Sequence, residues 1–237
     1  MSKYIKIILI ILLVFVGIYM VGKIAVIVFV QQKFSFSKTP TVYVKTKIFN
    51  DYQNVDTSGA DLIKLGNISF YLPSKNQFVK EQRPGGGVVV KKNNSTAIVI
   101  IPLEINNNSF ISNVIEKTQI QKIVDSKYGS GTAASDFQVT KAIFTTLPAD
   151  VSLFSSFRTD LVTYYALILK NVSIPTSKGV VYIIENNRYQ ALYIPDSKTG
   201  KGPLELYNKN GKNIATIVIS NASQQEISYI INTLNIE

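Results

Sequence analysis

The feature that most constrains this chain is a long apolar run near its start, from Ile7 to Val30, which carries one charge, at Lys23. Eighteen of its residues are Ile, Leu, Val or Phe. A helix of this length measures about 36 Å, enough to cross a hydrocarbon core of roughly 30 Å with some tilt. The run therefore predicts a transmembrane helix over residues 7–30, with the lipid bilayer as its partner.

Lys23 is the costly residue of this predicted helix. A lysine near the bilayer centre costs about 2.5–3.5 kcal/mol, whereas the apolar residues of the run together return roughly 5–10 kcal/mol. Insertion is therefore favourable overall. Two arrangements of the ammonium stay open: because Lys23 lies near the far end of the run, its side chain can extend toward the headgroups, or it can pair with an acid on a partner helix.

The stretch Gly17-Ile-Tyr-Met-Val-Gly-Lys-Ile24 within this run has the glycine and lysine spacing of a phosphate-binding loop. Such a loop also needs a preceding buried strand, a turn, and a Ser or Thr after the lysine to hold Mg²⁺. Here Ile24 occupies that position and no turn residue interrupts the apolar run. We therefore interpret the stretch as part of the apolar helix and expect no nucleotide partner.

The apolar run is too long for a cleaved signal peptide, and no small-x-small cleavage site precedes Val30. We interpret it as an uncleaved signal anchor behind a short tail, residues 1–6. Lysines lie on both sides, so the positive-inside rule barely discriminates. Single-span proteins with short N-terminal tails usually place the long domain outside the cytoplasm. We expect a cell-membrane protein with a periplasmic or extracellular C-terminal domain, and the Ile, Asn and Lys bias is typical of an AT-rich bacterial genome.

Beyond the anchor, the chain divides into two parts. Residues 31–65 are polar, are interrupted by Pro40 and by Thr57-Ser-Gly59, and predict a stalk. One alternating piece of it, residues 41–49, is consistent with a strand that packs on the main domain. Residues 66–237 are long enough for one domain with a substantial core.

Strand patterns enclose helix patterns in this domain. Predicted strands cover residues 67–72, 88–92, 96–101, 180–185, 189–194, 204–207 and 214–220. Predicted helices cover residues 109–128, the stretch capped by Asp136, the stretch starting at Pro148, residues 161–168, and a closing helix capped by Ser223 with Glu226 as its capping box. The fold class is therefore α+β: an N-terminal transmembrane helix, then an antiparallel sheet with packed helices in a two- or three-layer sandwich.

Three parts of the domain carry a resemblance to a known family. They are the opening Gly66-Asn-Ile-Ser-Phe-Tyr-Leu-Pro73, the late hairpin around Asn210-Gly-Lys212, and the final helix from Ser223. Over residues 66–101 and 180–236 the chain resembles membrane-tethered domains of the PsbP/Mog1-like type. The resemblance implies a sheet-and-helix sandwich that is generally non-catalytic and often an accessory factor of a membrane complex.

The chain contains no His and no Cys, which excludes Ser-His-Asp triads, Cys-His pairs and metal sites built from those ligands. Ser-Lys and carboxylate chemistry remain. Ser35-Phe-Ser-Lys38, Ser135-Asp136 and Lys198-Thr-Gly200 follow the motif order of penicillin-binding proteins. The first, however, lies in an alternating segment just past the anchor, and Phe137 stands where the second needs an amide. We expect no catalytic residue, no cofactor and no metal.

The basic charge of the chain does not indicate nucleic-acid binding. The formal net charge is +10, but four of the lysines belong to the anchor and its edges. The only arginines are Arg83, Arg158 and Arg188, whereas nucleic-acid interfaces favour arginine interleaved with aromatic residues. We interpret the scattered lysines as a solvated surface and expect no nucleic-acid partner.

Two Gly- or Pro-rich loops are the candidate protein-binding positions, because loops on a rigid sheet are where contacts collect. They are Arg83, Gly85 and Gly86 in the first loop and Lys198 and Lys201 in the second. Our hypothesis is a non-enzymatic, membrane-anchored, protein-binding domain, an accessory, assembly or immunity-type subunit at the cell envelope. The alternatives are an envelope enzyme that uses Ser-Lys or carboxylate chemistry, and a binder of anionic lipid or cell-wall polymer.

Overall fold

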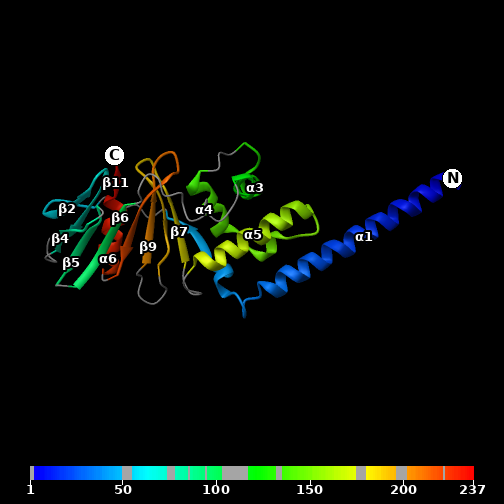
Figure 1. Cartoon of the computed structure of the whole chain (residues 1–237), viewed down its shortest axis with the longest axis horizontal. Coiled ribbons are helices and arrows are strands. Elements are labelled where there is room, and N and C mark those ends of the chain that lie inside the picture. Colours follow the sequence, from blue (N-terminus) through cyan, green and yellow to red (C-terminus); the bar gives the residue numbers. More distant parts are fainter. Residues whose placement is uncertain are drawn as a thin grey trace. The chain divides into compact units, whose positions relative to one another are not determined.

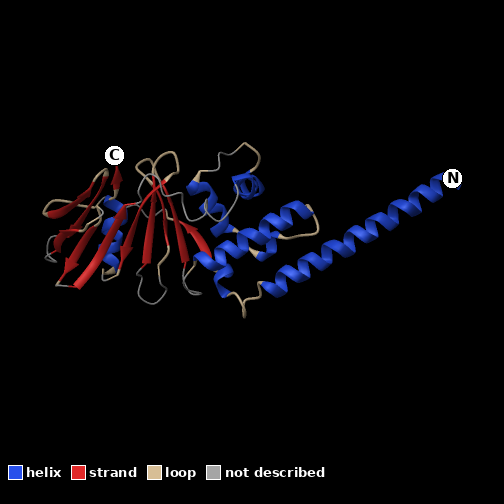
Figure 2. Cartoon of the chain, in the orientation of Figure 1, coloured by secondary structure: helices blue, strands red, loops and turns tan. Residues whose placement is uncertain are grey.

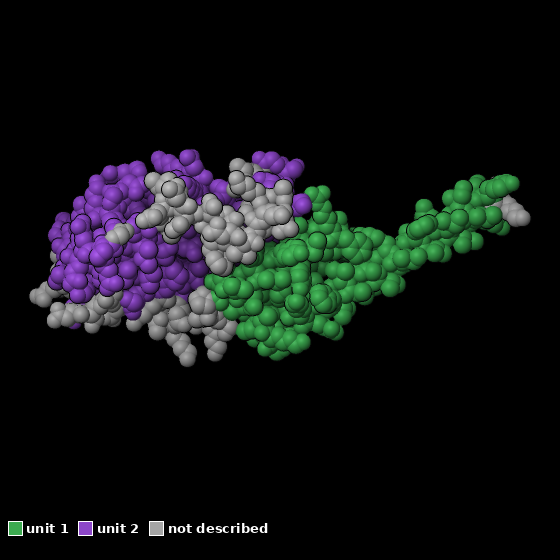
Figure 3. Space-filling model, in the orientation of Figure 1, with its two compact units in different colours: residues 1–43, 146–177 green, residues 44–145, 178–237 purple. Residues whose placement is uncertain are grey.

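The computed structural model of the chain describes residues 3–49, 55–73, 78–84, 86–93, 95–102, 117–131, 135–174, 180–195, 202–220 and 222–237. The chain forms two compact units (Figure 3). The first unit contains residues 1–43 and 146–177, and the second contains residues 44–145 and 178–237. These units group the residues differently from the predicted ranges 31–65 and 66–237, because residues 146–177 belong to the first unit.

The first unit is helical (Figures 1 and 2). Its elements are α1 (Lys3–Lys33), the 3₁₀ turn η1 (Pro40–Tyr43), the 3₁₀ turn η3 (Pro148–Asp150) and α5 (Phe157–Ser173). Helix α5 begins where the Ser156 hydroxyl accepts a hydrogen bond from the Thr159 N–H, which satisfies one of the free donors of its first turn. The predicted helix at Pro148 is therefore a single 3₁₀ turn, and α5 starts after it.

Helix α1 is one uninterrupted helix with two differently exposed parts. From Tyr4 to Val21 every side chain is exposed, and all but Lys6 and the glycine are apolar or aromatic. From Gly22 onward one face is covered, and Val30 and Phe34 pack with Val151 and Leu167 in a small core. The helix is long and apolar enough to cross a membrane, as the sequence predicts.

The second unit is built on a twisted eight-stranded sheet with the strand order β1-β7-β8-β9-β10-β6-β5-β4 (Figures 1 and 2). Its strands are β1 (Lys45–Ile48), β4 (Phe78–Gln82), β5 (Val88–Lys92), β6 (Ser95–Pro102), β7 (Val180–Glu185), β8 (Gln190–Tyr193), β9 (Gly202–Tyr207) and β10 (Asn213–Ile219). Neighbours pair antiparallel except β1 and β7, which are parallel, so the sheet is mixed. The predicted α+β class is confirmed.

A second layer covers one face of this sheet. It contains β2 (Ala60–Leu65), β3 (Ile68–Pro73), β11 (Asn235–Ile236) and α6 (Gln224–Thr233). Strands β2 and β11 flank β3 in a three-stranded sheet, and side chains such as Phe70 and Ile230 share one core with Ile98 and Ile217 of the large sheet. Strand β2 forms inside the range predicted as stalk, since it pairs along its whole length with β3.

The middle helices of the second unit are α3 (Lys117–Tyr128) and α4 (Asp136–Thr145). Helix α4 buries Phe137, which contacts the Tyr207 ring at 5.3 Å between centroids, and its Lys141 pairs with Glu185 at 2.6 Å. The predicted helix over 109–128 is thus present from Lys117, and residues 109–116 lie outside the described residues.

The capping box predicted for the closing helix is present at the start of α6. The Ser223 hydroxyl accepts from the Glu226 N–H, and the Glu226 carboxylate accepts from the Ser223 N–H at 2.7 Å and from Lys92 Nζ at 2.8 Å. Burial raises the pKa of this carboxyl, but the hydrogen bonds from Lys92 and Ser223 and the attraction of the Lys92 ammonium outweigh burial and lower the pKa overall.

We expect Glu226→Gln to make the free energy of unfolding less dependent on pH in the acidic range. Because the folded-state pKa is lowered, the ionised carboxylate stabilises the fold above the unfolded value of about 4.5, and this contribution is lost as pH falls through the lowered pKa. At pH 7 the variant should lose about 1 kcal/mol, because the amide can still accept from the Ser223 N–H but loses the charge that pairs with Lys92. At a pH below the lowered pKa the difference should vanish. Urea unfolding of the full chain in detergent at both pH values measures this.

Glu81→Gln is the matched control, since Glu81 pairs with Lys91 at 2.6 Å where both side chains are far more exposed than Glu226. An exposed pair contributes about 0–1 kcal/mol, so the control should change little at either pH. A Glu226→Gln variant that behaves like the control at pH 7 would show that the charge of the Glu226 carboxylate does not stabilise the fold.

Candidate functional site

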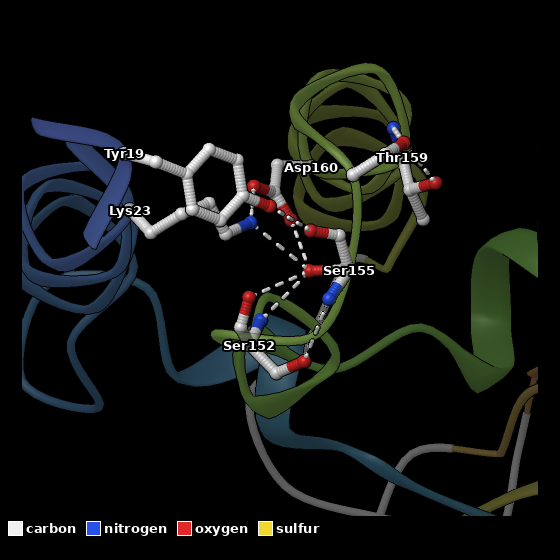
Figure 4. A network of polar contacts seen from close by, with 7 residues as sticks. Tyr19, Lys23, Ser152, Ser155, Thr159 and Asp160 are labelled. Carbon is white, nitrogen blue, oxygen red and sulfur yellow. Dashed lines mark hydrogen bonds and ion pairs between the residues drawn. The ribbon is translucent and has the colours of Figure 1, made fainter. Parts of the chain in front are cut away.

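The most distinctive site among the described residues is a buried polar network where α5 crosses α1 (Figure 4). It centres on Lys23, whose side chain is 0% exposed although it lies in an apolar helix. A lysine in such surroundings is costly unless its charge is balanced and its donors are used. The structure supplies both conditions.

Lys23 is balanced by Asp160, in the first turn of α5. Its ammonium makes an ion pair with the Asp160 carboxylate, whose side chain is 2% exposed. The ammonium also donates to the Ser155 hydroxyl at 3.2 Å and lies 5.2 Å from the centroid of the Phe157 ring. One lysine is therefore held by a carboxylate, a hydroxyl and the face of an aromatic ring, all close to the start of α5.

Ser155 connects this ion pair to the chain that precedes α5. Its hydroxyl lies 2.5 Å from the Asp160 carboxylate and 2.8 Å from the Ser152 carbonyl, and these two acceptors share its single proton. It also accepts from the Ser152 N–H at 3.1 Å, and the Ser155 N–H donates back to the Ser152 hydroxyl at 3.3 Å. The residues from Ser152 to Ser155 therefore form a turn braced from both ends.

Local sequence explains why α1 and α5 approach closely here. Gly22 has no side chain, and a Cβ at that position would lie 3.3 Å from Cζ of Phe157. One turn earlier, the ring of Tyr19 meets Phe157 edge-on at 5.4 Å, and its hydroxyl donates to the Ser155 carbonyl at 3.4 Å. Gly22 and Lys23 thus act together, since the glycine permits the contact and the lysine fastens it. Both residues belong to the stretch that resembled a phosphate-binding loop, and in the structure this stretch lies in the middle of helix α1.

Of the two arrangements left open for Lys23, the structure shows the pairing with an acid, and the acid belongs to the same chain. The other two predicted membrane positions differ from each other. Ile7 is exposed along with the rest of the first part of α1, whereas Val30 is buried in the core of the first unit. The apolar run therefore lies in one helix, whose first part is exposed and whose last part packs in the core of the first unit.

The network brings Ser155 and Lys23 together, as a Ser-Lys catalytic pair would, but its hydrogen bonds differ from those of such a pair. In such a pair the lysine nitrogen accepts the proton of the serine, and the serine oxygen faces a substrate. Here the Lys23 ammonium is engaged by Asp160, and the Ser155 oxygen takes part in four contacts inside the protein. The geometry is that of a structural clamp.

The fragments that follow the motif order of penicillin-binding proteins, from which no catalytic residue was expected, are described in part. Ser35 lies in a turn after α1, where its carbonyl accepts from the Lys38 N–H at 3.0 Å. Ser135 lies at the start of α4, and its hydroxyl accepts from the Gln138 N–H at 3.3 Å. Ser35 and Lys38 thus lie in a turn and not one turn apart on a helix face, and residues 198–200 lie outside the described residues.

The predicted partner-binding positions are described in part. Arg83 and Gly86 lie in the tight turn between β4 and β5, where the Arg83 N–H donates to the Gly87 carbonyl at 2.8 Å and the Gly86 N–H donates to the Arg83 carbonyl at 3.2 Å. Gly86 has a φ of +81°, a conformation that favours glycine. Gly85, Lys198 and Lys201 lie outside the described residues.

Sequence reasoning missed Ser155 and Asp160 as partners of Lys23. Asp160 lies in the first turn of α5, where an acidic side chain also interacts favourably with the helix N-terminus. The available signal was the need of a buried lysine for a carboxylate. Sequence separation of more than 130 residues gave no means of joining the two.

No family model, curated protein or solved structure matches this chain. The class of protein is therefore defined by its own geometry, as an α+β chain with an exposed apolar helix that is clamped to a second helix.

We expect Asp160→Leu to loosen α5 from α1, because it leaves the Lys23 ammonium buried without its counterion. Breaking a buried pair costs about 3–5 kcal/mol. Buried Lys170 reports the loosening, since trypsin cuts after it only when α5 opens. Cleavage there should accelerate roughly tenfold or more in the variant. Combining Lys23→Met with Asp160→Leu should restore most of the protection, because two apolar side chains replace the pair.

Lys6→Met is the control for this cycle, since Lys6 is an exposed lysine near the other end of the same helix. Its cleavage rate should match that of the natural chain. If the double variant is cut as fast as Asp160→Leu alone, the pair is not what holds the two helices together.

Proposed function

We propose that this protein is a single-pass, membrane-anchored, non-enzymatic protein-binding subunit of the cell envelope, with its second unit outside the cytoplasm. The observation that carries the proposal is the exposed part of α1. From Tyr4 to Val21 its apolar side chains find no cover, and these 18 residues measure about 27 Å, close to the thickness of a hydrocarbon core. A surface of this kind is stable in lipid and costly in water.

The clamp supports an anchoring role. A transmembrane helix that continued into a flexible linker would leave the following residues free to move. Here Lys23 and Asp160 fasten α1 to α5, and the Lys33 ammonium lies 5.1 Å from the centroid of the Tyr164 ring further along the same contact. The first unit is therefore held to the anchor helix as one packed body, at a constant distance from the bilayer.

The side-chain chemistry favours binding over catalysis. The chain lacks His and Cys, and within the described ranges no group of three or more acidic side chains is arranged to hold a metal ion. The half-buried Glu205 carboxyl, whose pKa is raised by burial, accepts from the Tyr207 hydroxyl at 2.7 Å, a contact between two residues on the same face of β9. The resemblance to PsbP/Mog1-like domains supports the same proposal, an accessory subunit of a membrane complex.

The anchor is tested by placing charge in the exposed part of α1. We expect the combined substitutions Leu12→Lys and Val16→Lys to move the chain from the membrane fraction to the soluble fraction, since each lysine near mid-bilayer costs about 2.5–3.5 kcal/mol. Phe36→Lys is the control, because Phe36 is equally exposed but lies beyond the end of α1. Extraction of membranes with alkaline carbonate measures the distribution.

The natural chain and the Phe36→Lys control should both resist extraction. A natural chain that carbonate releases, or a doubly charged variant that stays in the membrane, would contradict the anchor.

Protein binding is tested with a photo-crosslinking amino acid at Arg83 of the full chain in its native membranes. We expect one discrete adduct of higher mass that disappears without irradiation. Lys209, an exposed residue in the turn between β9 and β10, is the control position. Adducts at neither position, with the chain still in the membrane, would contradict a protein-binding role.

A further inference from the structure

The start of α5 presents an apolar surface that the clamp does not explain. Phe154, in the turn before the helix, is 98% exposed, and Phe157 and Leu161 are 44% and 54% exposed. Phe157 and Leu161 are four residues apart, so they lie on one face of the helix, directly after Phe154. We name these three residues the tip patch.

The exposure of Phe154 is fixed by the fold. It lies within the turn that Ser152 and Ser155 brace with reciprocal hydrogen bonds of 3.1 and 3.3 Å. Ser155 is in turn held by the Lys23 and Asp160 pair. A phenylalanine on a free loop could fold back onto the protein, whereas the turn that carries this one is held by a network that includes a buried ion pair.

The tip patch lies at a definite level along α1. Phe157 contacts Tyr19 at 5.4 Å between ring centroids and approaches Gly22, and these α1 residues mark the end of the fully exposed part of the helix. The patch is thus continuous with the apolar surface of α1, at the level where a bilayer spanned by Tyr4 to Val21 would end. Tyr19 at this level matches the preference of tyrosine for the membrane interface.

We propose that the tip patch inserts into the interfacial region of the same bilayer that α1 crosses, as a second membrane contact of the first unit. Aromatic and leucine side chains are favoured at the boundary between headgroups and acyl chains. Arg158, exposed beside Phe157, has a guanidinium that suits a lipid phosphate. This inference rests on the proposed anchor, and it commits to lipid rather than to a second protein.

The proposal also gives the clamp a reason for its burial. At the level of the tip patch, an ammonium at Lys23 would face acyl chains or headgroups if α5 were absent. The Asp160 carboxylate and the Phe157 ring enclose it on the side of α5. The charge is therefore neutralised at the depth where the helix pair enters the bilayer.

The test uses nitroxide labels on single cysteines, which the chain allows because it contains none of its own. Phe154→Cys and Leu161→Cys report on the patch, Ile11→Cys on the middle of the span, and Phe36→Cys on an exposed phenylalanine past the end of α1. The full-length protein is reconstituted in vesicles of phosphatidylethanolamine and phosphatidylglycerol. Relaxation by oxygen, which concentrates in lipid, is compared with relaxation by a water-soluble nickel complex.

We expect the ratio of oxygen to nickel accessibility at Phe154 and Leu161 to lie several-fold above that at Phe36 and below that at Ile11. Ratios at the patch that equal the Phe36 value, with Ile11 still in lipid, would overturn the tip contact and leave the anchor standing. A label at Phe154 shielded from both reagents would overturn it in favour of a protein cover. A nickel-accessible Ile11 would overturn the anchor and the tip contact together.

Discussion

The ion pair between Lys23 and Asp160 is the interaction on which the first unit depends. Without it, a charged lysine in the middle of an apolar helix and an aspartate inside a helical core would each be destabilising. Together they join segments more than 130 residues apart, and Ser155 extends the contact into the turn before α5. Residues 146–177 belong to the same unit as the N-terminal helix, and the pair is one of the contacts between them, beside the small core of Val30, Phe34, Val151 and Leu167.

This arrangement divides α1 into two parts with different roles. The part up to Val21 is uniformly exposed and apolar, which is what a bilayer requires, whereas the part from Gly22 has one face that packs on α5. Because both parts are equally apolar, the hydropathy of the sequence does not show where the exposed part of α1 ends and the packed part begins. Gly22 and Lys23 mark it, one by the absence of a side chain and the other by a charge that needs a partner.

Much of the fold followed from local patterns in the sequence. Turn residues, alternation and capping boxes act over a few residues, so they can be recognised in the sequence. These patterns predicted β5 and β6, the four strands from β7 to β10, and the cap at Ser223. Strand β2 was missed because its Asp61-Leu-Ile-Lys sequence lacks clean alternation, and only the pairing with β3 makes it a strand. In α5, Leu161 has the spacing of a core residue but lies on the exposed face. The partner of Lys23 depended on a long-range contact that no local pattern records.

Lys23 must keep Asp160 as its partner when the protein is in a membrane, if the pair holds α1 to α5 there. Solid-state NMR of the full-length chain in lipid bilayers tests this directly, through the dipolar coupling between a ¹⁵N-labelled Lys23 side chain and the ¹³C-labelled carboxyl of Asp160. A strong coupling that is lost in Asp160→Asn is the predicted result. A Lys23 nitrogen that shows no coupling to that carboxyl, and contacts lipid phosphate instead, would contradict the account.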